Sequence, residues 1–302
     1  MSYNNSRRGF IKGVSCLGIV LLNNKVTYGM LESPSRKVPL SGHVWVYASR
    51  FPPDWDCTPI LEQAFADFQA AGLEGMEFME SNLRNDNIIE LAGELINKYE
   101  IPVTGTSYYG DMWDKDQHQE IFEDLDLILD RLHKLNGKTL GITVGDAGRM
   151  KTTSELDDQG ILLQRILKLS EKYKIQPNLH NHTFEVEHDL YDFKGTIERV
   201  PELKIGPDIN WLIRAGVDPI AFIRKYGNRM VYLHIRDQDA NGNWTRAVGQ
   251  GVTDFTGIAQ VLKDVDFDGR AAIELAFEEP SRGSVREEWK ESRNYVKNIF
   301  GW

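Results

Sequence analysis

Short runs of β-branched and aromatic residues alternate with longer amphipathic segments along most of the chain. From His43 onward, eight such runs predict strands. The predicted strands span 43–48, 74–79, 101–106, 139–144, 175–182, 203–210, 230–236 and 270–276. The segments between them have helical periodicity, which is clearest in the apolar stripe Ile121, Leu125, Ile128, Leu129, Leu132 and Leu135. This alternation is typical of a parallel sheet with helical crossovers.

Eight strand–helix units in about 260 residues match the size and unit count of a (β/α)8 barrel. We therefore predict an α/β fold, a TIM barrel that forms a single domain over 41–302, because no linker or composition shift divides this stretch. A doubly wound open sheet is the alternative. Helix starts are predicted at four local signals: Thr58-Pro59, Asp218-Pro219, and the capping-box spacings Thr152-x-x-Glu155 and Ser284-x-x-Glu287.

The first 30 residues have a different pattern. A basic segment, Ser6-Arg7-Arg8-Gly9-Phe10-Ile11-Lys12, precedes an apolar run from Val14 to Leu22. This order is typical of export signals, and the paired arginines are similar to those of twin-arginine signals. We expect residues 1–30 to direct export by the twin-arginine route to the periplasm. The alternative is a cationic N-terminal helix that frays.

The charge balance restricts the partners. The 35 basic and 45 acidic side chains give a net charge of −10, whereas a nucleic-acid binder needs a basic surface, so we expect no nucleic-acid partner. Two cysteines support neither a disulfide framework nor a cysteine-rich zinc site. No apolar run reaches the roughly 18 residues of a membrane span, so we expect no stable membrane insertion after export. Nothing in the pattern excludes a homo-oligomer.

Polar side chains occur at inward-facing positions near the ends of the last four predicted strands. Because side chains alternate between the faces of a strand, the apolar partners on each strand assign the other parity to the barrel interior. The inward side chains are His180 and His182, Asp208, His234 and Arg236, and Glu274. Active sites of TIM barrels lie at the C-terminal ends of their strands. These residues are therefore expected to share one site.

Buried carboxylates are costly unless they are paired, and a divalent cation would account for their convergence with imidazoles. We predict metal ligation by His180, Asp208, His234 and Glu274, with His182 as an alternative to His180. Mixed nitrogen and oxygen ligands suit Mn, Zn, Fe or Co better than Mg or Ca. The competing interpretation makes each histidine a hydrogen-bonded core residue. His43, His118, His133 and His188 lack comparable support and are predicted to be structural or surface residues.

Several segments resemble the xylose isomerase-like barrel superfamily of sugar phosphate isomerases/epimerases, over roughly 41–300. The segments that carry the resemblance are Leu179-His-Asn-His-Thr-Phe-Glu185, Pro207-Asp-Ile-Asn-Trp211 with Arg214-Ala-Gly-Val-Asp-Pro219, Leu233-His-Ile-Arg-Asp237, Val248-Gly-Gln-Gly-Val-Thr-Asp-Phe255 and Ile273-Glu274. Many members of the branch carry twin-arginine signals. The resemblance implies a divalent metal, most often Mn, held by Glu, Asp, His and Glu.

Asp208, His234 and Glu274 match the last three of those ligands, but His180 stands where many relatives have Glu. This departure weighs against a mechanism with two opposed glutamates. Arg236 stands where relatives often have Lys, and a guanidinium can form bidentate contacts that an ammonium cannot.

The predicted chemistry is proton removal next to a sugar carbonyl, through an enediolate, with Glu274 or His182 as the base. Return of the proton gives an isomerase or epimerase, which we favour. Loss of a leaving group gives a lyase or hydratase acting on 3-keto sugars or 3-keto glycosides. A sugar-binding protein without turnover is a further alternative. The expected substrate is a small sugar, and the expected substrate contacts are Trp45, Tyr108, Glu185, Trp211 and Arg236.

Overall fold

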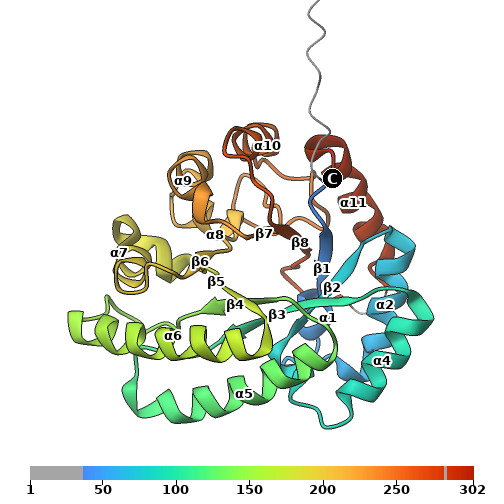
Figure 1. Ribbon diagram of the computed structural model, residues 1–302. Helices are drawn as coiled ribbons and strands as arrows, with labels where there is room; N and C mark the ends of the chain where they lie inside the picture. Colours follow the sequence, from blue (N-terminus) through green and yellow to red (C-terminus); the bar gives the residue numbers. More distant parts are fainter. Residues whose placement is uncertain (1–36, 282–283) are drawn as a thin grey trace, which may run out of the picture. The chain divides into compact units, whose positions relative to one another are not determined.

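The computed structural model describes residues 37–281 and 284–302. Within this part of the chain, eight strands run parallel in the order β6-β5-β4-β3-β2-β1-β8-β7. Isolated bridges Ile205–Met230 and Asp208–His234 connect the two remaining edges, so the barrel is nearly closed. The predicted TIM barrel is thereby confirmed, and the open sheet is excluded. Figure 1 shows the helices arranged around the strands.

The strands of the barrel are short. They are β1 (Leu40–His43), β2 (Gly75–Met79), β3 (Val103–Tyr109), β4 (Thr139–Thr143), β5 (Gln176–Leu179), β6 (Lys204–Ile205), β7 (Tyr232–Ile235) and β8 (Arg270–Glu274). The strands predicted at 175–182 and 203–210 are thus wrong at their ends. The continuous strands end at Leu179 and Ile205, single backbone contacts follow them, and the chain then enters helices that begin at Thr183 and Ile209.

The longer helices follow the strands in sequence. They are α2 (Leu61–Ala71), α4 (Ile88–Tyr99), α5 (His118–Lys134), α6 (Thr153–Tyr173), α7 (Thr183–Arg199), α9 (Pro219–Tyr226), α10 (Phe255–Asp264) and α11 (Arg286–Phe300). Shorter helical elements are α1 (Trp45–Ala48), α3 (Glu80–Leu83), α8 (Ile209–Arg214), η1 (Thr58–Ile60), η2 (Lys115–Gln117) and η3 (Gly227–Arg229). The stripe predicted on α5 is buried at Ile121, Leu125, Ile128, Leu129 and Leu132.

The strand predicted at 43–48 is wrong. β1 ends at His43, where its register with Glu77 and Glu274 also ends, and Trp45–Ala48 form a helical turn instead. The amide of Ala48 bonds to the carbonyl of Val44, which is the helical pattern. The alternation of apolar residues over 43–48 was misleading, because Tyr47 is not in a strand. Its buried hydroxyl bonds to Asp67 and Trp289.

Two of the four predicted helix starts are confirmed. Thr152 and Glu155 form the capping box of α6, and Asp218 caps α9. At the other two a helical element begins at or near the predicted position, but the predicted cap is wrong. η1 begins at Thr58 with Pro59 in its first turn, and Cys57 precedes it without a side-chain cap. The hydroxyl of Ser284 lies 3.1 Å from Asp67 Oδ1, so it contacts a neighbouring element and α11 has no side-chain cap.

Residues 1–30, the predicted export signal, lie outside the described residues. Among the residues that are described, no helix combines the length and the apolar character needed to cross a bilayer.

Candidate active site

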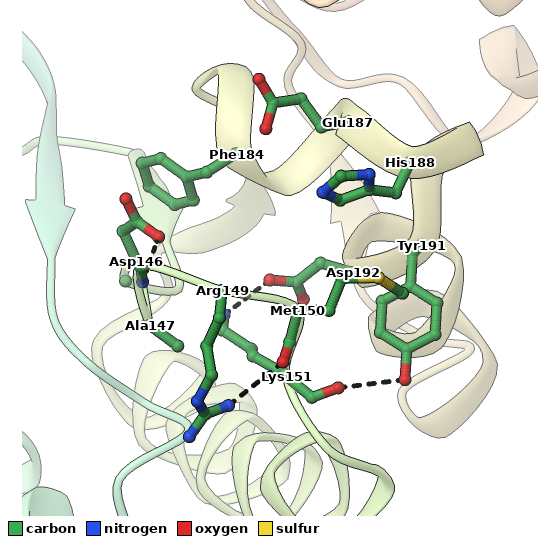
Figure 2. Close-up of a pocket in the computed structure, with 12 residues that line it drawn as sticks. Asp146, Ala147, Arg149, Met150, Lys151, Phe184, Glu187, His188, Tyr191 and Asp192 are labelled. Carbon is green, nitrogen blue, oxygen red and sulfur yellow. Dashed lines mark hydrogen bonds and ion pairs between the residues drawn. The ribbon is translucent and has the colours of Figure 1, made fainter.

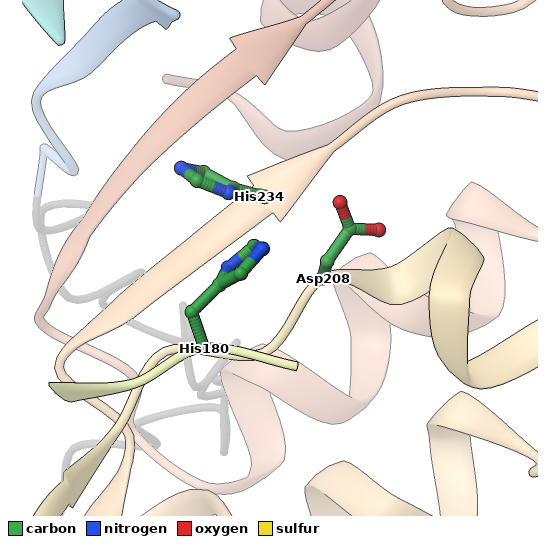
Figure 3. Close-up of side chains that lie close together, drawn as sticks. All are labelled: His180, Asp208 and His234. Carbon is green, nitrogen blue, oxygen red and sulfur yellow. The ribbon is translucent and has the colours of Figure 1, made fainter. Parts of the chain in front are cut away.

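Three side chains converge at the C-terminal ends of neighbouring strands. His180 follows β5, Asp208 precedes α8 and His234 lies in β7. Each of them offers one ligand atom, and these atoms all lie within 4.8 Å of one another (Figure 3). The three residues are at most 5% exposed. Three of the side chains that strand parity assigned to the barrel interior therefore lie close together.

Asp208 is positioned by the start of α8. Its Oδ1 accepts hydrogen bonds from the amides of Asn210 and Trp211, at 2.9 and 3.2 Å, as in other aspartate N-caps. Its Oδ2 forms no hydrogen bond although it is buried. The cap therefore fixes the carboxylate and leaves one oxygen for the site.

His234 is oriented by Glu77 at the opposite side of its ring. Its Nε2 lies 2.8 Å from Glu77 Oε2, which also accepts a 2.7 Å hydrogen bond from the Tyr232 hydroxyl. Nδ1 has no hydrogen-bond partner. Burial alone would lower the pKa of His234, but the charge of Glu77 outweighs it and raises the pKa to about 9. A carboxylate behind an imidazole is the usual arrangement for a histidine that ligates a metal.

Glu274 and Arg236 form an ion pair beside these three residues. Arg236 Nη2 contacts Glu274 Oε1, and Arg236 Nε lies 2.8 Å from Asp208 Oδ2, without hydrogen-bond alignment. Burial alone would raise the pKa of Glu274, but Arg236 and the adjacent histidines outweigh it and lower the pKa to about 2. Glu274 is therefore ionised at neutral pH.

His182 borders the same site as a neutral imidazole. Burial, followed by the charge of Arg236, lowers its pKa to about 4. Its Nδ1 lies 3.3 Å from Thr143 Oγ1, and its ring stacks on Phe184 with centroids 5.7 Å apart. The site thus presents two different groups that can accept a proton, the carboxylate of Glu274 and the imidazole of His182.

Two of the predicted substrate contacts border the site. Trp211 lies in the first turn of α8, and its ring centroid lies 5.3 Å from that of His182. Trp45 begins α1, two residues after the end of β1, and its amide donates to His43 Nδ1 over 3.2 Å.

Two other predicted contacts have structural partners instead. Tyr108 faces the outer helices, where the Arg84 guanidinium lies 6.0 Å from its ring, so it is turned away from the barrel interior. Both oxygens of Glu185 accept backbone hydrogen bonds, from Val144 at 3.0 Å and His182 at 2.6 Å. Nothing in these contacts favours a role for Glu185 in substrate binding, which stays a prediction.

Sequence reasoning missed His43 and Glu77. His43 was predicted to be structural or on the surface, yet it is buried at the end of β1, with Nδ1 3.7 Å from Glu274 Oε2. The amide of Trp45 donates to this Nδ1, so Nε2 carries the proton and donates to Ser107 Oγ at 3.1 Å. The same period-two parity, applied to the first two strands, would have found both residues.

A separate pocket of about 220 Å³ opens between the loop after β4 and the first turns of α7 (Figure 2). Lys151 lies in it and forms a buried ion pair with Asp192, with 2.6 Å between Nζ and Oδ2. Phe184 lines this pocket and also stacks on His182, so it forms a wall shared by the pocket and the site. The pocket therefore lies beside the convergent histidines rather than over them.

The donor set fits a divalent cation. Asp208 Oδ2 and His234 Nδ1 are buried polar atoms without a hydrogen bond, and His180 adds a third possible ligand atom at close range. Burial, followed by the adjacent His234, lowers the pKa of His180, which favours the neutral form that a ligand needs, whereas His234 would have to lose the proton that Glu77 favours before it bound a cation. Glu274, the fourth predicted ligand, is not part of the set.

Comparison with known proteins places the chain in a family. A sequence model described as "Xylose isomerase-like TIM barrel" matches residues 65–299. The chain belongs to this family. Among curated members, the inosose dehydratase of Clostridium beijerinckii is 22% identical over 286 residues, which cover 83% of this chain and 93% of the relative.

Solved structures of sugar epimerases share the fold. D-allulose 3-epimerase from Methylomonas sp. has a TM-score of 0.71 at 17% identity, covering 87% of this chain and 98% of its own. The 3-keto-D-glucoside 4-epimerase of E. coli has a TM-score of 0.68 at 15% identity, covering 87% and 100%. At such low identity these similarities establish the architecture alone.

Proposed function

We propose that this xylose isomerase-like barrel is a metal-dependent sugar isomerase or epimerase that removes a proton next to a carbonyl group. The observation that supports this most directly is the convergence of His180, Asp208 and His234 beside the ionised Glu274. A divalent cation held by the first three would act as a Lewis acid on a sugar carbonyl. The metal most often used by the family that the sequence resembles is Mn, and Zn, Co, Fe and Mg are alternatives.

The two proton-accepting groups have distinct tasks in this proposal. Glu274 is ionised and takes the proton from the carbon next to the carbonyl, and Arg236 holds its carboxylate in place. His182 is neutral, so it accepts a proton from one sugar atom or returns one to another. Trp211 and Trp45 supply flat apolar surfaces that would pack against the ring of a sugar.

A lyase or hydratase acting on 3-keto sugars or 3-keto glycosides is the second candidate. It is supported by the curated relative, which is a dehydratase. It is also supported by the site itself, because this chain has His180 at a position where many xylose isomerase-like proteins have a glutamate. One carboxylate and one imidazole suit removal of a proton and protonation of a leaving group.

The two candidates are separated by the fate of solvent deuterium. We expect the purified protein, loaded with Mn²⁺ in D₂O, to introduce deuterium into a ketohexose or a 3-keto glucoside, as followed by NMR. Label in an otherwise unchanged skeleton supports isomerisation or epimerisation, and release of water or aglycone supports the lyase. No exchange with any keto sugar, with metal bound, would contradict both and leave a sugar-binding protein.

Glu274→Gln is the matched variant for this assay. It keeps the size of the side chain and removes its charge, so we expect loss of exchange by about two orders of magnitude or more for a general base, with an unchanged circular dichroism spectrum. Full exchange in a folded Glu274→Gln protein would assign the proton transfer to another group.

We further propose that residues 1–30 direct export to the periplasm. The support is the paired arginines Arg7 and Arg8 before the apolar run 14–22. Replacing both with lysine keeps the charge, and we expect the variant to stay in the cytoplasmic fraction while the native chain reaches the periplasm. Equal fractionation of the two proteins would contradict the twin-arginine route.

A further inference from the structure

The pocket of about 220 Å³ has two walls, and both start beside His182. The first wall is the loop after β4, which leaves the strand at Thr143, and Thr143 Oγ1 lies 3.3 Å from His182 Nδ1. The second wall is the start of α7, where Phe184 stacks on the His182 ring. Substrate sites of TIM barrels are built from the loops at this end of the strands. The pocket is therefore placed as an outward extension of the proposed active site.

The pocket has room for one further ring of a substrate. A cavity of roughly 150 Å³ can hold benzene, so about 220 Å³ suffices for a six-membered ring with small substituents. Figure 2 shows the rings of Phe184 and His188 on opposite sides of the pocket. Met150, which also lines it, is a large apolar side chain that is 49% exposed. Two flat rings and an uncovered apolar side chain form a surface on which a sugar ring can pack.

The lysine and the arginine at the pocket are already engaged. Lys151 pairs with Asp192, with 2.6 Å between Nζ and Oδ2, and Arg149 Nη1 lies 2.8 Å from Glu155 Oε2. By contrast, Glu187 lines the pocket, is exposed, and has no hydrogen bond or ion pair with any residue that the structure describes. The uncompensated charge at the pocket is therefore negative, which opposes a phosphate or carboxylate ligand.

The free polar atoms of the pocket suit hydroxyl groups instead. Glu187 offers carboxylate oxygens, and Asp146 offers Oδ2, since its Oδ1 accepts the amide of Gly148 at 2.7 Å. The two ring nitrogens of His188 have no hydrogen-bond partner among the described residues, and a neutral imidazole provides one donor and one acceptor. A sugar hydroxyl can donate to the carboxylates and can pair with either nitrogen. These groups therefore complement a neutral ring that carries hydroxyls.

A strained turn holds His188 at the pocket. His188, Asp189 and Leu190 are consecutive left-handed residues, with φ of 51°, 59° and 62°, and they interrupt α7. Left-handed backbone is unfavourable for residues other than glycine, and such strain is concentrated at ligand-binding and catalytic sites. In a regular helix His188 would lie on the same face as Phe184, four residues earlier. The turn therefore separates the two rings and leaves the pocket between them.

We propose that this pocket is a second substrate subsite, which binds a neutral hydroxylated ring attached to the sugar that reacts at the histidines. This inference rests on the proposed function. The substrate is then a keto glycoside whose second unit is itself a sugar, rather than a free keto sugar or a sugar phosphate. Phe184 connects the two subsites, because it packs on His182 and also lines the pocket.

The first test compares three substrates on the Mn²⁺-loaded full chain. They are a methyl 3-keto glucoside, the 3-keto derivative of a glucose disaccharide with the same anomeric configuration, and fructose 6-phosphate. NMR in D₂O gives kcat/KM for deuterium exchange or product formation. We expect the disaccharide to exceed the methyl glucoside by at least about tenfold, the lower end of what contacts in a pocket supply, and the phosphate to be the poorest. A disaccharide no better than the methyl glucoside, or a preferred phosphate, would overturn the inference.

The second test closes the pocket. Ala147 lines it from the loop after β4, so Ala147→Trp puts an indole where the second ring would lie. We expect the ratio of kcat/KM for the disaccharide over the methyl glucoside to fall towards one, in a protein with a native circular dichroism spectrum. Val252→Trp is the matched control, since it adds the same ring at a 65% exposed position in the loop after β7 and should leave the ratio at its native value.

His188→Asn keeps the test decisive if Ala147→Trp does not fold. Asparagine tolerates the left-handed backbone, so this variant removes the flat ring without adding strain. We expect the same ratio to fall by about two- to tenfold, the worth of one stacked ring. An unchanged ratio in a folded His188→Asn protein would contradict the subsite.

A binding measurement separates this inference from the proposed function. Isothermal titration of the metal-loaded chain with the unoxidised disaccharide and with methyl glucoside requires no turnover. If no keto sugar exchanges deuterium, but the disaccharide binds more tightly and loses this advantage in Ala147→Trp, the proposed function fails and the subsite stands. If both keto glycosides exchange with equal kcat/KM, and the ratio is the same in Ala147→Trp, the subsite is refuted and the proposed function stands.

Discussion

At the scale of single residues, the orientation of His234 depends on a group that is far away in sequence. Glu77 lies 157 positions earlier in the chain, yet its carboxylate is 2.8 Å from His234 Nε2 and 1% exposed. Burial alone would raise the pKa of Glu77, but the charge of His234 outweighs it and lowers the pKa. Strand parity could have identified Glu77 as an inward residue, but its contact with His234 could not be predicted, because it joins strands that are not neighbours in the barrel.

Glu77→Gln tests that support. Loss of the negative charge should make His234 a weaker ligand, and we expect metal affinity to fall by about 10–100-fold, as for other groups behind ligating histidines. Isothermal titration with Mn²⁺ or Zn²⁺ measures it. Tyr232→Phe is the control, since it removes the other hydrogen bond to Glu77 and leaves the carboxylate in place. Equal affinities of native protein and Glu77→Gln would show that Glu77 has no such role.

At the scale of elements, the local sequence predicted those features whose hydrogen bonds join residues within one helical turn. The capping box of α6 is an example, because Glu155 accepts the amide of Thr152 at 2.7 Å while Thr152 Oγ1 accepts the amide of Glu155 at 3.2 Å. The same spacing failed at Ser284, whose hydroxyl contacts Asp67, 217 positions away. Long-range partners override a local signal that is worth about 1 kcal/mol.

Thr152→Ala should lower the free energy of unfolding by about 1 kcal/mol at neutral pH, as loss of an N-cap does. Chemical denaturation measures it, and Ser154→Ala, an exposed position in the same turn, should have no such cost.

The pH dependence of this cap has a definite sign. The hydrogen bond from Arg149 is the main cause that lowers the pKa of Glu155 to about 2 from 4.5. Because the folded pKa is depressed, this stabilisation is complete above about pH 4.5 and is lost as the pH falls towards 2. Glu155→Gln should therefore lower the free energy of unfolding at neutral pH, and this loss should shrink as the pH falls towards 2. A loss of the same size at pH 2, measured by chemical denaturation, would contradict this account.

At the scale of the whole molecule, the barrel closes where its strands are shortest. β6 has two residues, and only isolated bridges join it to β7. Beside this closure, the side chain of Asn181, which follows β5, bonds to the backbone of Asp208, which follows β6. Its Oδ1 accepts the amide of Asp208 at 3.2 Å, and its Nδ2 donates to the carbonyl of Asp208 at 3.4 Å. Asn181 therefore fixes the backbone of Asp208, the proposed metal ligand that also bridges to His234 across the closure.

Asn181→Ala should destabilise the barrel by about 1–3 kcal/mol, because it leaves the buried amide of Asp208 without its hydrogen-bond partner. It should also weaken metal binding, since Asp208 loses its anchor. Thermal unfolding with and without Mn²⁺ measures both effects, and the exposed Asn228→Ala serves as the control. A variant with native stability and native metal affinity would refute this role of Asn181.

The sequence by itself determined the barrel, and it assigned His180, Asp208, His234 and Glu274 to the interior near the ends of the last four strands, where we propose the site. Those features follow from periods of two and 3.6 residues, which are local and survive in a linear pattern. Only the tertiary structure decided which of these side chains bring their ligand atoms close together. It also decided that Arg236 contacts two carboxylates and that Glu77 and His43 lie beside the site. These contacts join residues that are far apart in the chain, and a distance between side chains is a property of the closed barrel that no local spacing encodes.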